Sequence, residues 1–211
     1  MPDTAHDLIS TRWTLIARLK DWDDHESWRE FFDSYWRLIY GVAIKSGLTH
    51  AEAQDVVQET IVSVSKNMKD FRADPSFGSF KSWLLTLTRW RITDQVRRRG
   101  REVHLAPGEN LSTADSSRTR PEDRMPDPDA AFDKIWEQEW EHHVIEQALE
   151  KVKHECDARH YQVFYLNAIK QVPAARVAEL LNINVDQVYL IKHRLGKIFE
   201  DAVKAVETPP S

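Results

Sequence analysis

The sequence predicts an all-α protein of two small helical domains joined by a flexible linker, with a helix-turn-helix in the second domain. Three observations lead to this prediction. Glycine and proline are scarce, at 6 and 9 of 211 residues. Apolar residues recur at intervals of three and four, as in helices that bury one face. Residues 101–133 interrupt this pattern. We therefore expect an N-terminal domain in residues 1–100 and a C-terminal domain in residues 134–206.

Helical patterns fill the N-terminal domain from Thr11 to about Arg99. The first clear apolar stripe consists of Trp28, Phe32, Tyr35, Ile39 and Val42. A second helix is expected to begin after Thr49, because Thr49 and Glu52 have the spacing of a capping box. Its apolar face would carry Val57, Ile61, Val64 and Met68. Pro75 and Gly78 mark residues 70–78 as a loop, and a third helix is expected from Phe80 to Arg99. Its inward side chains would be Trp83, Leu84, Leu87 and Ile92.

Residues 101–133 differ in composition from the rest of the chain. Proline and glycine stand among Ser, Thr and Asp, and few apolar side chains remain to offset the entropy of ordering. We expect a flexible linker. Helical periodicity resumes beyond it, with an apolar series at Trp136, Trp140, Val144, Ala148 and Val152. A second helix of this domain is expected from roughly Arg159 to Ile169.

The segment Ala174–Leu195, AARVAELLNINVDQVYLIKHRL, is typical of a helix-turn-helix. Two apolar series with helical spacing flank Asn182-Ile183-Asn184. Ala178 is small enough to let two helices cross closely. Asn182 stands where the turn needs a left-handed backbone, which Asn tolerates better than most residues. The alternative is an ordinary pair of helices within a helical domain.

Charge is segregated along the chain, although the net charge is only -5. Residues 89–101 carry six arginines and a single acid, Asp94. Residues 102–133 carry eight acids against three arginines. A local basic patch beside an acidic stretch fits a protein that binds DNA at one place without being a general polycation.

Other function classes find little support. No phosphate-binding glycine loop or nucleophile motif occurs, so we expect no enzyme, no metal site and no cofactor. Glu139 and His142 make one Glu-x-x-His, but a di-iron bundle needs two copies and two further Glu. Cys156 is the single cysteine, which fits a reducing compartment. No apolar run has the length of a membrane span, and we expect a cytoplasmic protein.

Three motifs in order resemble those of bacterial RNA polymerase sigma factors of the extracytoplasmic-function (ECF) type. Asp55-Val56-Val57-Gln58-Glu59 resembles the family's D-x-x-Q-[DE]. Phe80-Lys81-Ser82-Trp83-Leu84, with Arg89 and then Asp94 to Arg99, resembles its F-x-x-W-L…R…D-x-x-R-R-R. The helix-turn-helix resembles the C-terminal domain that reads the upstream promoter element. The resemblance covers roughly residues 25–100 and 137–205.

The resemblance implies core RNA polymerase and promoter DNA as partners, and leaves open whether an anti-sigma protein restrains the chain. It places polymerase docking on one helix face, consisting of Glu52, Asp55, Gln58 and Glu59. The structural alternative for these acids is a solvated face that complements the helix dipole.

DNA contacts are expected at two places. In the promoter-melting segment, arginines would bind phosphates and aromatics would stack on unpaired bases. The candidates there are Phe77, Phe80, Arg89, Trp90, Arg91, Asp94, Arg97, Arg98 and Arg99. Phe80 could equally be a core residue, and Trp83 is expected in the core. In the helix-turn-helix, the candidates for base edges and phosphates are Gln187, Leu190, Lys192, His193, Arg194 and Lys197.

The chain departs from the family where the recognition helix begins. The usual Gly-Thr-Val-Lys-Ser-Arg is Asp186-Gln187-Val188-Tyr189-Leu190-Ile191 here, so the promoter sequence cannot be inferred. Two other functions stay open. One is a stand-alone helix-turn-helix regulator that binds duplex DNA as a dimer. The other is a sigma-like interaction module that has lost DNA binding.

Overall fold

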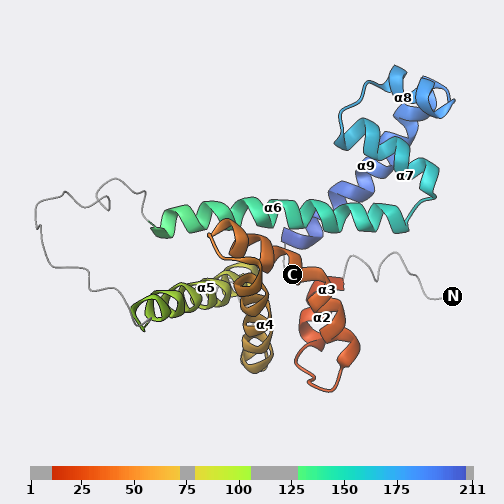
Figure 1. Ribbon diagram of the computed structural model, residues 1–211. Coiled ribbons are helices and arrows are strands. Elements are labelled where there is room, and N and C mark those ends of the chain that lie inside the picture. The colour runs from red at the N-terminus through yellow and green to blue at the C-terminus, as the bar shows by residue number, and fades with distance from the viewer. Residues whose placement is uncertain (1–10, 72–78, 106–127, 208–211) are drawn as a thin grey trace, which may run out of the picture. The chain divides into compact units, whose positions relative to one another are not determined.

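The computed structural model describes residues 11–71, 79–105 and 128–207, which form helices joined by short turns and loops, without a strand (Figure 1). The all-α prediction is confirmed. The helices are α2 (Thr11–Arg18), α3 (His25–Lys45), α4 (His50–Asn67), α5 (Phe80–Leu105), α6 (Pro128–His154), α7 (Ala158–Phe164), α8 (Ala174–Leu181) and α9 (Val185–Glu207). A π-helical turn, η2 (Tyr165–Ile169), continues α7.

The chain divides into two compact units. One comprises residues 28–141, and the other combines residues up to 27 with residues 142–211. Both dividing points fall inside helices, namely α3 and α6. The flexibility predicted for residues 101–133 cannot be followed in full, because residues 106–127 lie outside the described residues. At the two ends of that stretch the chain is helical, to Leu105 in α5 and from Pro128 in α6.

The core side of α3 differs in part from the predicted stripe. Tyr35, Ile39 and Val42 are buried as predicted, but Phe32 is 41% exposed. Phe31 takes the inward position instead, with its ring against those of Tyr35 and Phe80. The reason is that residues 31, 35, 38 and 42 share one side of a helix with 3.6 residues per turn, and Phe32 lies one step beyond it.

Helix α4 begins as the sequence predicts. The Thr49 side chain accepts a hydrogen bond from the Glu52 backbone N–H, and the Glu52 carboxylate accepts one from the Thr49 N–H at 2.7 Å. Gly47 follows the end of α3 and has a φ of +87°, a backbone conformation that residues with a Cβ rarely adopt. The buried side of α4 includes Val57 and Val64. Met68, also predicted on that face, is fully buried, whereas Ile61 is only partly buried.

In the unit that contains α7–α9, a short turn joins α8 to α9. Asn182 is left-handed, with φ 50° and ψ 56°, which confirms the prediction for this position. Its N–H and that of Ile183 bond to the last carbonyls of α8. The Asn184 side chain then accepts a bond from the Asp186 N–H, and its own N–H donates to Gln187 Oε1 at 3.1 Å. The turn therefore provides hydrogen-bond partners for free backbone groups at the end of α8 and at the start of α9.

A core of mostly branched and aromatic side chains holds this unit together. It includes Val163 and Phe164 of α7, Val177 of α8, and Val188 and Leu195 of α9, all at most 1% exposed. Arg159 adds a polar link, since its Nη2 donates to the Leu181 carbonyl at 2.8 Å. The start of α9 is thereby fixed relative to α7 and α8.

Candidate nucleic-acid and polymerase interfaces

The acidic face predicted for polymerase docking lies against α5. Each of its three acids accepts from a side chain of that helix. Glu52 accepts from Arg99 Nε at 2.8 Å, and Asp55 accepts from Gln95 Nε2 at 3.3 Å. Glu59 accepts from Arg98 Nη1 at 2.7 Å. Gln58, the fourth predicted docking residue, is exposed.

These pairs perturb the ionisation of the groups involved. Hydrogen bonding by Arg99, then by the backbone and side chain of Thr49, lowers the pKa of Glu52 from 4.5 to about 2. Hydrogen bonding by Glu59 raises the pKa of Arg98, and Glu52 does the same for Arg99. The acidic face and part of the arginine cluster therefore stabilise each other's charged forms.

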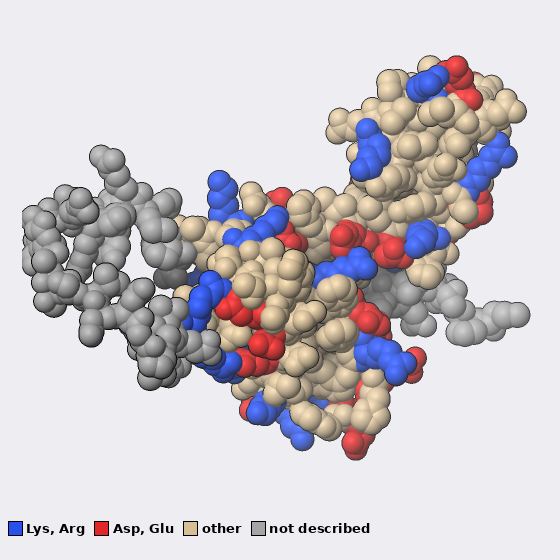
Figure 2. Space-filling model, viewed as in Figure 1, with Lys and Arg blue, Asp and Glu red and all other residues tan. Residues whose placement is uncertain are grey.

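The arginine cluster is less uniformly basic than its sequence indicates. Figure 2 shows, on the face in view, acidic and basic side chains side by side over α4 and α5. Arg91 donates to Ser63 Oγ at 3.0 Å and lies 3.7 Å from Asp94. Among the cluster's arginines whose side chains the structure describes, Arg97 is the most accessible, with 69% of its side chain exposed and a 3.0 Å contact to Asp94. Arg98 and Arg99 keep 48% and 42% exposure despite their partners.

The aromatic candidates separate into core and surface. Phe80 is a correction to the predicted DNA-contact set: it is 4% exposed and packs on Phe31, Tyr35, Phe71 and Trp83. A ring enclosed in this way cannot stack on a base. Trp83 itself is partly buried.

Trp90 is the aromatic side chain of α5 that solvent reaches most, at 60% exposure. It lines a shallow hollow of about 300 Å³ together with Arg89, Arg91, Thr93 and Asp94. An exposed indole beside guanidinium groups is the combination that holds unpaired bases. Phe77 lies outside the described residues, so the structure gives no position for it.

Helix α9 presents the second set of candidates. Val188, Ile191 and Leu195 face the core, whereas all six predicted contact residues are exposed. They do not share one face. Lys192 and Arg194 are two positions apart, about 200° around the helix axis, whereas His193 and Lys197 lie on the same side, one turn apart.

Tyr189 and Leu190 are 57% and 70% exposed. Sequence reasoning missed Tyr189, although its position directly after the buried Val188 already placed it off the core side. Its exposure makes it a further candidate contact residue on α9.

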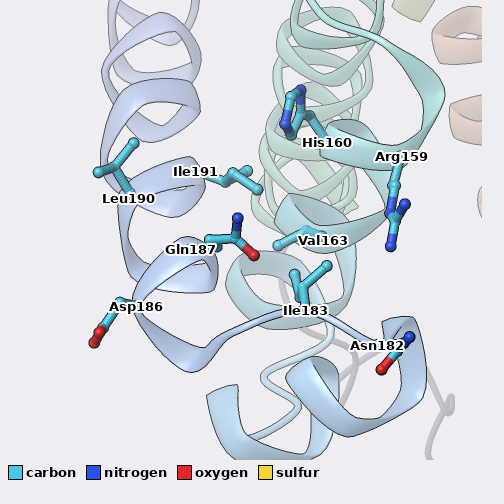
Figure 3. A pocket seen from close by; sticks show the side chains of 9 residues that line it. All are labelled: Arg159, His160, Val163, Asn182, Ile183, Asp186, Gln187, Leu190 and Ile191. Atoms are coloured by element: carbon cyan, nitrogen blue, oxygen red, sulfur yellow. The ribbon is translucent and has the colours of Figure 1, made fainter.

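A pocket of about 580 Å³ lies beside the first turn of α9. Figure 3 shows Gln187 and Ile183 directed toward Val163 of α7, while Asp186 points away from α7. The Gln187 side chain is thus partly occupied by contacts within the protein, because its Oε1 also accepts a hydrogen bond from the Asn184 backbone N–H. Of the predicted base-contacting residues, it is the one most constrained by the fold.

Within the described residues, no three His, Cys, Asp or Glu side chains gather closely enough to hold a metal ion. Burial, with neighbouring Asp157, raises the pKa of the Cys156 thiol, which disfavours the reactive thiolate. None of the helices described here is both long and apolar enough to cross a lipid bilayer.

Comparison with known proteins identifies one part of the chain. The sigma-70 region 2 family model matches residues 31–102, which cover most of α3 and all of α4. The solved structure of CnrH in complex with the cytosolic domain of CnrY gives a TM-score of 0.35 at 17% identity, over 91% of this chain and 96% of that one. A likeness of that size adds nothing about partners.

Curated relatives agree with the family match. The ECF RNA polymerase sigma factor SigE of Mycolicibacterium smegmatis is 35% identical over 85 residues, which are 40% of this chain and 29% of that protein. The ECF sigma factor RpoE of Cereibacter sphaeroides is 28% identical over 89 residues, 42% of this chain and 48% of the relative. The matches thus span less than half of each relative. Residues 31–102 therefore match the sigma-70 region 2 family, and the resemblance of this chain to ECF-type sigma factors is confirmed.

Proposed function

We propose that this chain binds core RNA polymerase and directs it to promoters, as a two-domain sigma factor. The observation that carries the proposal is the sigma-70 region 2 match over residues 31–102, whose α5 presents an exposed Trp90 and Arg97. Melted DNA loses base stacking and exposes phosphates, so a surface that stabilises it needs an accessible ring and cations. The chain itself makes no RNA in this proposal.

The two candidate DNA surfaces would divide the work. Trp90 and Arg97 on α5 suit an unpaired strand, because the indole can stack on bases of any sequence. The exposed side of α9 carries Leu190, His193 and Lys197, a mixed set that suits base edges and phosphates in a duplex groove. In this proposal the unit with α4 and α5 opens the downstream element, and α9 reads the upstream one.

Docking on polymerase would use the exposed part of the α4 face. Asp55 and Gln58 are exposed, whereas Glu52 and Glu59 are partly covered by their α5 partners. A basic partner would add to these contacts, since a carboxylate can accept from more than one donor.

The deciding experiment is promoter-dependent run-off transcription with purified core polymerase, combined with co-purification of the chain with that polymerase. Two double variants test the division of work on duplex and on pre-melted templates. Trp90→Ala with Arg97→Ala is expected to impair both templates, with a defect that grows with salt because phosphate contacts release counterions. His193→Ala with Lys197→Ala is expected to impair the duplex and spare the pre-melted template. Lys66→Ala and Lys204→Ala, each an exposed lysine elsewhere on α4 or α9, serve as charge-matched controls.

The outcomes separate the candidate functions. Failure to bind core polymerase, together with specific binding to duplex DNA, would favour the stand-alone regulator. Polymerase binding without transcription from any promoter would favour a module that has lost DNA binding. Equal failure of both double variants on the pre-melted template would refute the division of work.

A further inference from the structure

The first half of α6 contacts α3 and α5 through three ion pairs. Asp133 pairs with Arg89, Glu137 with Lys81 at 2.5 Å, and Glu139 with Lys45 at 2.5 Å. All six side chains belong to the compact unit of residues 28–141. Asp133 and Glu137 lie one turn apart on the same side of α6 and pair with α5, whereas Glu139 lies about 200° from Glu137 around the helix axis and pairs with α3. The three cations therefore belong to two helices that contact α6 on different sides.

Two of the cations meet an aromatic face as well as a carboxylate. The Arg89 guanidinium lies 4.8 Å from the centre of the Phe132 ring, and Lys81 Nζ lies 5.5 Å from that of Trp140. An anionic group combined with a π face is also what a nucleotide presents, through its phosphate and its base. Residues 132–140 thus offer to α5 the chemistry of a short nucleic-acid strand.

Glu139, the partner of Lys45, lies very close to the backbone of α3. A Cβ at Gly41 of α3 would collide with the Glu139 carboxylate, so the absence of a side chain there lets the acid sit against α3. Exposure of the partners is moderate: Lys81 and Arg89 are 29% and 28% exposed, against 56% for Glu137 and for Asp133. In these two pairs the cation is the more covered partner, whereas in the third pair Lys45 is 46% exposed and Glu139 12%.

We propose that Lys45, Lys81 and Arg89 form a binding surface for single-stranded nucleic acid, and that residues 132–140 of α6 cover this surface in the structure. Arg89 adjoins the exposed Trp90 in the same hollow, so the surface continues the one proposed for melted DNA and rests on that proposed function. Lys81 adds a cation on α5, and Lys45 adds one on α3. The apparent affinity of a covered surface equals its intrinsic affinity multiplied by the fraction of molecules in which the surface is open.

The test compares two triple variants of the full chain that remove the same charge. The uncovering variant is Asp133→Asn, Glu137→Gln and Glu139→Gln. The matched control is Glu141→Gln, Glu146→Gln and Glu150→Gln, which changes three exposed acids of α6 outside the contact. Affinity for a fluorescein-labelled oligothymidylate is measured by fluorescence anisotropy at several salt concentrations, and circular dichroism checks that both variants stay helical.

The uncovering variant is expected to bind the oligonucleotide about tenfold more tightly than the control. Adding Arg89→Ala to it should return the affinity to that of the control. Gly41→Ala offers a second route that changes no charge, because it displaces the Glu139 carboxylate, and it should raise the affinity in the same direction.

Equal affinity of the uncovering and control variants, or a gain that survives Arg89→Ala, would overturn the inference. Co-purification with core polymerase is measured on the same samples. If the chain binds polymerase and the variants do not differ on the oligonucleotide, the covered surface is refuted while the proposed function stands. If the chain does not bind polymerase, the proposed function fails.

Discussion

The left-handed Asn182 gives a quantitative test of the turn between α8 and α9. Its φ of 50° and ψ of 56° lie in the region where a Cβ is placed too close to the following carbonyl. Asn tolerates this region because its short polar side chain can hydrogen-bond locally, and Gly tolerates it because it has no Cβ. Ala has a Cβ and no polar side chain, so it adopts this conformation only with strain. We expect Asn182→Ala to lower the free energy of unfolding of this unit by about 1 kcal/mol. Asn182→Gly should stay close to the original, because relief of strain offsets the greater freedom of the unfolded chain.

The assay must report on the α7–α9 unit. Amide hydrogen exchange of α8 and α9 peptides measures its opening free energy, and thermal unfolding should show a fall of about 4–8 °C for Asn182→Ala. Affinity for duplex DNA at 25 °C should change little, since 1 kcal/mol leaves the folded fraction near one. Equal exchange protection in the alanine and glycine variants would refute the argument from backbone geometry.

Three further predictions concern α4 and α5. The pKa of Glu52 is about 2 in the folded chain against an ordinary 4.5, so its contribution to stability is complete above about pH 4.5 and is lost as pH falls toward 2. Glu52→Gln should flatten that part of a denaturation curve measured against pH, and an unchanged curve would contradict the pairing. Phe80→Ala should cost about 3–5 kcal/mol in urea unfolding, whereas Trp90→Ala should cost less than about 0.5 kcal/mol yet weaken binding to unpaired DNA. Glu59→Arg should lower the unfolding temperature and Arg98→Glu should restore it in the double variant, without restoring core polymerase binding. Normal polymerase binding by that double variant would argue against docking at Glu59.

Local sequence was enough for the features that depend on neighbours a few residues apart. The capping box at Thr49 and the left-handed Asn182 were both predicted, because a cap or a turn is set by side chains within three or four positions. The family motifs likewise located α4 and α5. One signal in the sequence was overlooked: Phe132, Trp136 and Trp140 follow one another at intervals of four residues, and Phe132 is buried in α6.

Only the tertiary structure decided which side chains face one another across helices. Glu59 and Arg98 are 39 residues apart, and Arg89 and Asp133 are 44 apart. Periodicity tells which side of a helix is apolar, but not which neighbour lies opposite each charge. For the same reason the sequence predicts two separate binding faces from the acids of α4 and the arginines of α5, although the structure pairs them with each other. Phe80 could not be assigned from its spacing either, since its burial depends on Phe31 and Phe71 from other segments of the chain.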